Sequence, residues 1–117
     1  NTNGAGFDVP SFITKDGIIR TNFKVTESMI NEYGEFNFPI DIKEVDGFFK
    51  CINLRLKSLE GCPKIITGSF ICYGNKLKSL EGCPKFVGGD FDITENYKDF
   101  TEEEVRAVCD VKGKVYV

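Results

Sequence analysis

The chain has 117 residues, which is enough for one domain with one hydrophobic core. Its 41% apolar and 28% charged residues are ordinary for a globular protein, and a net charge of −3 excludes a whole-chain attraction to nucleic acid or anionic lipid. No apolar run approaches the roughly 20 residues that a membrane-spanning helix needs, so we expect no membrane partner.

Residues 1–46 are interpreted as a lead-in followed by an N-terminal cap. The apolar segments 12–14 and 18–20 flank the pair Asp16-Gly17, which is typical of tight hairpin turns, so we expect a β-hairpin whose second strand extends to Val25. Residues 26–33 are interpreted as one or two helical turns. A degenerate repeat is expected to begin near residue 28, and a small functional module over 8–46 is the alternative.

The middle of the chain repeats itself. The text LKSLEGCPK occupies residues 56–64 and again residues 77–85, 21 residues later. A period near 20 indicates stacked structural units, each of which buries its apolar side against its neighbours. We therefore interpret residues 47–100 as about three stacked repeats.

Each repeat begins with a glycine, followed by two apolar residues two positions apart. The pairs are Phe49/Cys51, Phe70/Cys72 and Phe91/Ile93. Alternation with period two predicts a short strand with one buried face, and strands of successive repeats then pair in parallel. We expect the three phenylalanines to form one interior column.

The remainder of each repeat is expected to bring the chain back to the next strand. Leucines fill the turn after the strand, and Gly61-Cys62-Pro63 bends the chain into a return segment without ladder hydrogen bonds, since proline lacks a donor. Gly68 either adopts a positive φ or packs tightly before the next strand. Asn75 and Asn96 are expected to bond backbone groups at the turn.

Residues 101–117 predict a C-terminal cap. Thr101 followed by Glu104 is a capping box, and Val105 and Val108 give one apolar face to a short helix over 102–109. Residues 115–117 are expected to form a final strand on the edge of the last repeat, which protects that edge from aggregation.

The pattern F-x-C-x-x-N-x-L-x-S-L-E-G-C-P-K resembles the leucine-rich repeat, and it looks most like the short repeats of bacteriophage proteins. The resemblance covers residues 43–100. It implies an α+β fold: a small leucine-rich-repeat-like solenoid with short parallel strands, an N-terminal β-hairpin cap and a C-terminal helix–strand cap. It also implies that the row of parallel strands binds another protein.

The sequence offers little for catalysis. Cysteines 51 and 72, like 62 and 83, are one repeat apart, and with no C-x-x-C motif and no histidine we expect neither a zinc site nor a disulfide framework. The usual general base is missing and no phosphate-binding loop is present, so we expect no enzyme and no cofactor. Five free cysteines favour a reducing compartment, the cytoplasm, or the host cytoplasm for a viral protein.

The strand geometry predicts a contact surface on the outward side of the repeats. Its residues are Phe48, Lys50, Ile52, Ser69, Ile71, Tyr73, Asp90, Asp92 and Thr94. Several large apolar side chains exposed together indicate an interface. The alternative is that the N-terminal segment covers these residues, which would then belong to the core.

Three functions follow, in order of preference. The first is a non-catalytic protein–protein interaction module. The resemblance to bacteriophage repeats implies a phage protein that binds or inhibits a host factor. The second is a structural or assembly module of a virion or larger complex. The third is nucleic-acid binding through the repeated lysines Lys57, Lys78, Lys64 and Lys85, since cations spaced by one repeat can follow a phosphate backbone.

Overall fold

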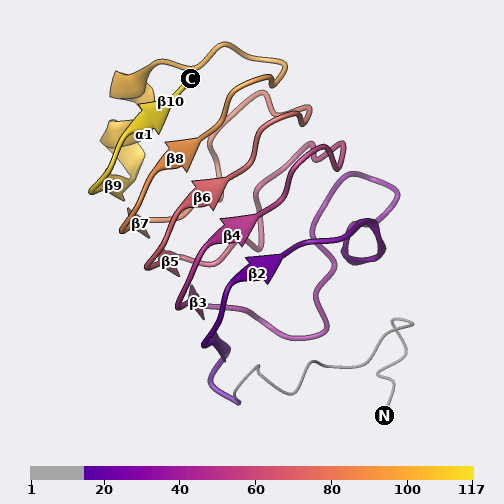
Figure 1. Ribbon diagram of the computed structural model, residues 1–117. Helices are drawn as coiled ribbons and strands as arrows, with labels where there is room; N and C mark the ends of the chain where they lie inside the picture. Colours follow the sequence, from indigo (N-terminus) through magenta and orange to yellow (C-terminus); the bar gives the residue numbers. More distant parts are fainter. Residues whose placement is uncertain (1–14) are drawn as a thin grey trace.

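The computed structural model describes residues 15–117, which build two five-stranded parallel sheets around one core (Figure 1). The even-numbered sheet has the order β10 (Val115–Tyr116), β8 (Phe91–Asp92), β6 (Phe70–Ile71), β4 (Phe49–Lys50), β2 (Phe23–Lys24). The odd-numbered sheet has the order β1 (Ile18–Ile19), β3 (Glu44–Val45), β5 (Ile65–Ile66), β7 (Phe86–Val87), β9 (Asp110–Val111). Each turn of the chain therefore adds one strand to each sheet.

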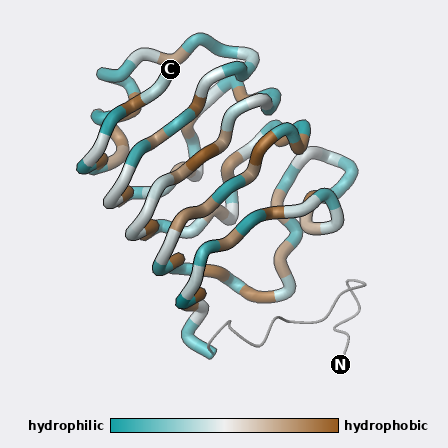
Figure 2. Tube along the Cα trace, viewed as in Figure 1, coloured by the Kyte–Doolittle hydropathy of each residue, from teal (hydrophilic) through white to brown (hydrophobic). Residues whose placement is uncertain are grey.

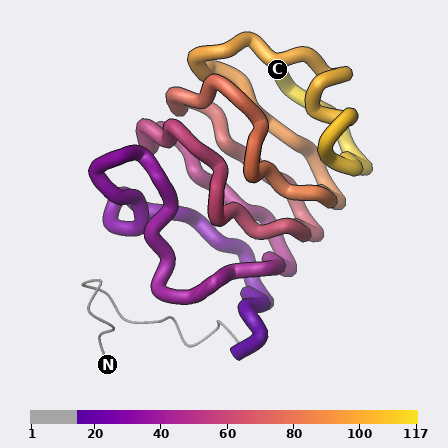
Figure 3. The backbone as a smooth tube through the Cα atoms, turned by 180° about the vertical axis from the view of Figure 1, so that it is seen from behind, coloured from indigo at the N-terminus to yellow at the C-terminus, as the bar shows by residue number. Residues whose placement is uncertain are grey.

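Successive turns lie on one another, as the view from behind shows (Figure 3). The described chain measures 43 × 28 × 17 Å along its principal axes. Apolar residues recur at corresponding places in neighbouring turns (Figure 2). No helix within residues 15–117 has the length and apolar character to cross a membrane.

The predicted phenylalanine column is confirmed. Phe49 pairs with Phe70 and Phe70 with Phe91, and all three side chains are 0% exposed. Their ring centroids are 6.0 and 4.9 Å apart, and Phe23 extends the column at 5.8 Å from Phe49. The even-numbered sheet is therefore held by one continuous file of aromatic rings.

The expectation that the return segment lacks ladder bonds is wrong. Ile66 pairs with Val45 on one side and Val87 on the other, and all three side chains are completely buried. Pro63 removes only its own N–H, and the ladder begins again at Ile65, where Lys43 and its neighbours supply backbone partners. The return segment thus forms the odd-numbered sheet.

The corner between the two sheets requires a glycine at residue 68. Its N–H donates to the Gly47 carbonyl at 2.9 Å, and a Cβ at this position would lie 2.7 Å from that carbonyl group. Gly68 is not among the residues with positive φ. Tight packing, the second of the two expectations for Gly68, is the correct one.

The predicted N-terminal hairpin differs from the structure in its second strand, which does not run on to Val25. Its first strand, residues 12–14, lies outside the described residues, while Ile18–Ile19 pairs in parallel with β3 and Phe23–Lys24 in parallel with β4. The turn at Gly17 does exist, with φ +82°, but it packs against the next turn of the stack, where Lys43 N–H donates to the Gly17 carbonyl at 2.9 Å. Segments 18–19 and 23–24 therefore belong to different sheets.

Residues 18–46 form a further turn of the stack, with a longer period. Phe23 and Phe49 are paired 26 residues apart because the intervening segment also holds a short 3₁₀ helix, η1 (Glu27–Met29). The expected helical turns over 26–33 are thus confirmed only for η1. Val45 pairs with Ile66 at the 21-residue offset of the repeats, which agrees with a degenerate repeat before residue 47.

The C-terminal prediction is confirmed. The helix α1 (Glu102–Val108) begins with the expected capping box, in which Thr101 Oγ1 accepts from the Glu104 N–H at 3.1 Å. The strand β10 pairs with β8. Arg106 ties the helix to the last turn, because its guanidinium donates to the Val111 carbonyl at 2.7 Å.

The asparagines bond the backbone, as expected. Asn75 Oδ1 accepts from the Leu54 and Leu56 N–H groups, each at 3.0 Å. Its Nδ2 donates to the Cys51 carbonyl at 2.7 Å. Asn96 makes the corresponding bond one turn later, where Oδ1 accepts from the Leu77 N–H at 3.0 Å.

Candidate protein-binding face

The outward side of the even-numbered sheet carries one central side chain from each strand. In order across the sheet these are Lys24, Lys50, Ile71, Asp92 and Tyr116, paired by the strand register. Their neighbours on β2, β4, β6 and β8 are buried phenylalanines and the neighbour on β10, Val115, is half-buried, whereas these five side chains are half-buried or exposed. We call this surface the strand face.

The structure brings together the residues predicted for the contact surface. Three strands, β4, β6 and β8, supply them, and their register places the three residues of one strand beside those of the next. The side chains are half-buried, and Tyr73 is the most open of the nine at 37% exposure. The nine positions are Phe48, Lys50, Ile52, Ser69, Ile71, Tyr73, Asp90, Asp92 and Thr94.

Several polar members of this set already have backbone partners. Ser69 Oγ accepts from the Asp90 N–H at 3.0 Å, and Asp90 Oδ1 accepts from the Lys114 N–H at 2.8 Å. Asp92 Oδ1 accepts from both the N–H and the hydroxyl of Thr94, at 2.9 and 2.7 Å. These side chains fasten one turn to the next or close a local turn, which leaves the apolar members as the groups free to contact a partner.

The apolar members lie towards the middle of the strand face. Ile71 is flanked across the strands by Lys50 and Asp92, and Tyr73 follows it on the same side of the chain. Lys50 Nζ lies 4.4 Å from the centroid of the Phe48 ring, which is a cation–π contact. The face therefore combines an apolar centre with a cationic border on the β2–β4 side and an anionic border at β8.

Two residues of the strand face were missed from the sequence. Lys24 precedes Val25 in the alternation that Phe23 begins, and Tyr116 stands between two valines, so both carry the period-two signal. The fixed offset of 21 hid them, because the pairing distance at the N-terminal end is 26. A search for alternation alone finds both residues.

The alternative, in which the N-terminal segment covers the strand face, does not hold for the strands formed by residues 15–46. The strands β1, β2 and β3, which come from residues 15–46, continue the two ladders side by side with the repeats. They extend the sheets and do not lie across the strand face. Residues 1–14 lie outside the described residues.

The cysteines are placed for packing. All five are buried, and the sulfurs of Cys51 and Cys72 are 3.0 Å apart in the interior. Burial raises the pKa of the Cys62 thiol well above its ordinary value and raises that of Cys109 to about 12. Thiols in such surroundings are poor nucleophiles. Within residues 15–117 no group of three or more histidine, cysteine or acidic side chains has the geometry to hold a metal ion.

The repeated lysines divide into two sets. Lys57 and Lys78 line a hollow of about 370 Å³ together with Lys76 and Tyr97. Lys64 and Lys85 are exposed elsewhere on the surface, and Lys64 Nζ donates to the Gly82 carbonyl at 3.4 Å. We call the first site the basic hollow.

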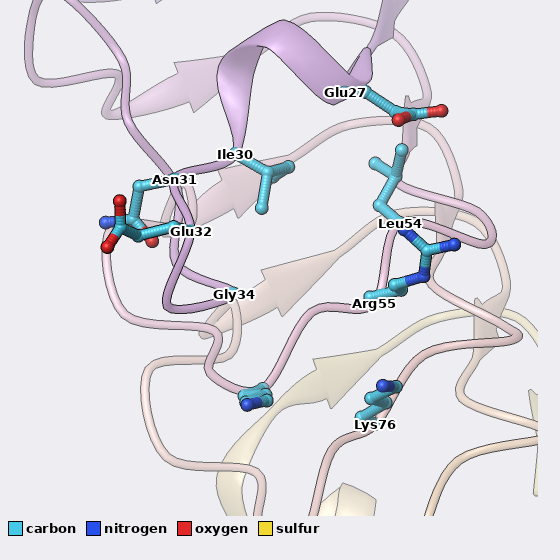
Figure 4. A pocket seen from close by; sticks show the side chains of 9 residues that line it. Glu27, Ile30, Asn31, Glu32, Gly34, Leu54, Arg55 and Lys76 are labelled. Carbon is cyan, nitrogen blue, oxygen red and sulfur yellow. The ribbon is translucent and has the colours of Figure 1, made fainter.

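A second hollow, of about 280 Å³, adjoins the basic hollow and shares Lys57 and Lys76 with it. Figure 4 shows Arg55 and Lys76 along one wall and Asn31 and Glu32 on the opposite wall. We call it the mixed hollow, because it presents both signs of charge.

No family model, no curated protein and no solved structure matches this chain.

Proposed function

We propose that the chain is a non-catalytic protein-binding module, that its stacked turns form a leucine-rich-repeat-like solenoid, and that it contacts its partner through the strand face. The observation that carries the proposal is the division between the two sides of the strands. Phe49, Phe70 and Phe91 are completely buried on the inner side. The apolar side chains on the outward side remain partly exposed, although the core is filled without them.

The chemistry of the strand face suits a protein partner. Large apolar and aromatic side chains at the centre of an interface supply most of its binding energy, and the charged rim sets orientation and association rate. Ile71 and Tyr73 are placed for the first role, and Lys24, Lys50 and Asp92 for the second. A partner would therefore present an apolar patch with an acidic group towards β2 and β4.

The likeness of the repeat to short bacteriophage repeats favours a host protein as the partner, with inhibition of that protein as the mode of action. An assembly role in a virion or larger complex is the alternative. The same strand face serves both, since each requires a protein partner. The two differ in whether the captured partner comes from the host or from the complex to which the chain belongs.

Affinity capture from a lysate of the native host tests the proposal. We expect the parent chain to capture a defined partner that Ile71→Asp and Tyr73→Ala each lose by about tenfold or more, because both changes remove central contacts. The matched control is Ile65→Asp, since Ile65 is 41% exposed on the odd-numbered sheet. Urea denaturation of each variant checks that the fold is retained.

Equal capture by the parent and by the two strand-face variants refutes the proposal. So does equal loss in the Ile65 control, because a general effect of a new carboxylate would then explain the result. Binding that persists at high salt separates this interface from one held by the lysines.

A further inference from the structure

The basic hollow is built by three successive turns of the stack. Lys57 and Lys78 occupy one repeat position, and Lys76 and Tyr97 occupy another. All four lie in the segments that follow strands β4, β6 and β8, away from the strand face. The repeat therefore concentrates three ammonium groups and an aromatic ring at one place.

The three lysines of the basic hollow form no ion pair within the described chain, although Glu27 and Glu32 line the adjoining mixed hollow. The lining of the basic hollow itself contains no carboxylate. Among the interactions of residues 15–117, no ion pair or hydrogen bond involves the ammonium group of Lys57, Lys76 or Lys78. Three neighbouring like charges repel one another, and a bound anion would relieve that repulsion.

Ion pairs in the described chain involve three cations near its C-terminal end: Lys98 lies 3.1 Å from Glu104, Arg106 lies 2.8 Å from Glu102, and Lys112 lies 3.4 Å from Asp110. Exposed lysines elsewhere in residues 15–117, such as Lys24 and Lys85, also lack an ion pair, so what distinguishes the basic hollow is the gathering of three such lysines at one place.

Tyr97 adds a flat apolar surface to the charge. Its side chain is 61% exposed, and Lys78 Nζ lies 5.9 Å from the ring centroid. Bases stack on exposed aromatic rings, and lysine ammonium groups bind phosphate oxygens. A hollow of about 370 Å³ is within the size range of small-ligand sites.

We propose that the basic hollow binds a free nucleotide, with its phosphates on Lys57, Lys76 and Lys78 and its base stacked on Tyr97. The site is separate from the strand face and does not depend on the proposed protein partner.

A nucleic acid strand is the less favoured ligand. A strand requires cations that continue along its backbone. The other repeated lysines, Lys64 and Lys85, do not line either hollow, and the carboxylates of Glu27 and Glu32 line the mixed hollow. The cations are thus gathered at one point, which suits the compact charge of a nucleotide di- or triphosphate.

Titration of the full chain with ATP, inorganic triphosphate and a single-stranded adenine oligonucleotide tests the proposal. Nuclear magnetic resonance follows the backbone amides, and tyrosine fluorescence reports stacking without interference, since the chain has no tryptophan. We expect ATP to shift the amides around residues 57, 76, 78 and 97. Lys76→Gln with Lys78→Gln should weaken ATP binding by about tenfold or more.

A control variant and an aromatic variant separate the contribution of the lysine charges from that of base stacking on Tyr97. The double change Lys64→Gln with Lys85→Gln removes the same charge from elsewhere and should leave ATP binding within about twofold. Tyr97→Leu should weaken ATP binding and leave triphosphate binding unchanged, because triphosphate has no base.

Three results overturn the proposal. The first is the absence of ATP-induced shifts at the basic hollow. The second is an equal loss of binding in the Lys64/Lys85 control, which would indicate diffuse charge attraction. The third is tighter binding of the oligonucleotide than of ATP, which would assign the hollow to a nucleic acid strand. None of these results affects the capture experiment on the strand face.

Discussion

Replacing Asn75 with alanine should lower the free energy of unfolding by about 3–5 kcal/mol. The side chain is 5% exposed and satisfies three backbone groups: the N–H groups of Leu54 and Leu56 and the carbonyl of Cys51. Each buried polar group left without a partner costs about 1–3 kcal/mol. The lower part of the summed range is expected, because the Leu54 N–H is only partly buried and can bond water.

Asn96→Ala is the matched control, with the same residue type one repeat later. This side chain accepts from one N–H, that of Leu77, where Asn75 accepts from two, and it donates to the Cys72, Ile93 and Thr94 carbonyls; it is also more exposed than Asn75. Water can replace part of what is lost, so we expect a cost of about 1–2 kcal/mol. Burial and the number of bonds, not residue type, then account for the difference.

Equilibrium urea denaturation followed by circular dichroism measures both losses, with an unchanged m-value as the check for two-state behaviour. Native-state hydrogen exchange adds a local measurement, in which the Leu54 and Leu56 amides should exchange faster in Asn75→Ala than the global loss requires. Equal losses for the two variants, or a loss below about 1 kcal/mol for Asn75→Ala, would refute the reasoning.

Four further predictions concern the core, the helix N-cap and the thiols. Phe70→Ala should cost about 3–5 kcal/mol in urea denaturation, because it opens a cavity in a completely buried ring column. Thr101→Ala should cost about 1 kcal/mol by removing the helix N-cap. The backbone N–H of Thr101, which bonds the Glu104 carboxylate, lowers the pKa of that carboxyl below its ordinary 4.5, and Lys98 lowers it further. The stabilisation that the ionised carboxylate provides is therefore complete above the ordinary pKa and is lost as the pH falls through the lower folded pKa. The difference in free energy of unfolding between the parent and Glu104→Gln should shrink over that acidic range. All five thiols should react slowly with Ellman's reagent at about pH 8 until urea unfolds the chain, and fast labelling in the native state would contradict their burial.

The interior of the repeats could be predicted from the sequence. Phe49, Phe70 and Phe91 recur at a fixed offset within a period-two pattern, and close packing allows few other arrangements of such large rings. The Asn75 prediction succeeded for a related reason, since a buried amide must find partners and the turning backbone supplies them. When the same packing or hydrogen-bonding requirement recurs in each turn, the same residue type recurs at the same repeat position, and this repeat can be seen in the sequence.

The second sheet was not predicted, because its sequence signal is short. Ile65–Ile66 and Phe86–Val87 are adjacent apolar pairs without alternation, and they follow a proline that indicates a break. The partners that complete their ladder are Glu44–Val45 and Asp110–Val111, which lie outside the clear repeats. Only the three-dimensional stack brings these segments together.

The prediction of one strand from residue 18 to Val25 was wrong, because a turn signal does not specify how far the following strand runs or which strand it pairs with. Asp16-Gly17 does turn the chain, yet β1 pairs with β3, 26 residues further along. The parallel pairing buries Ile19 and Val45 completely, and tertiary burial therefore prevails over the local signal.

The inward and outward sides of the even-numbered strands differ in how strongly the fold constrains their residues. The inward column reads phenylalanine at four successive paired positions, whereas the outward column reads Lys24, Lys50, Ile71, Asp92 and Tyr116. The fold requires the first pattern and tolerates almost any residue in the second, because the outward side chains add little to a core that is already closed. The hollows follow the same logic, since Lys76 and Tyr97 stand at one repeat position with different chemistry. We therefore propose that positions at which the repeat keeps its geometry and changes its side chain determine which ligands this molecule binds.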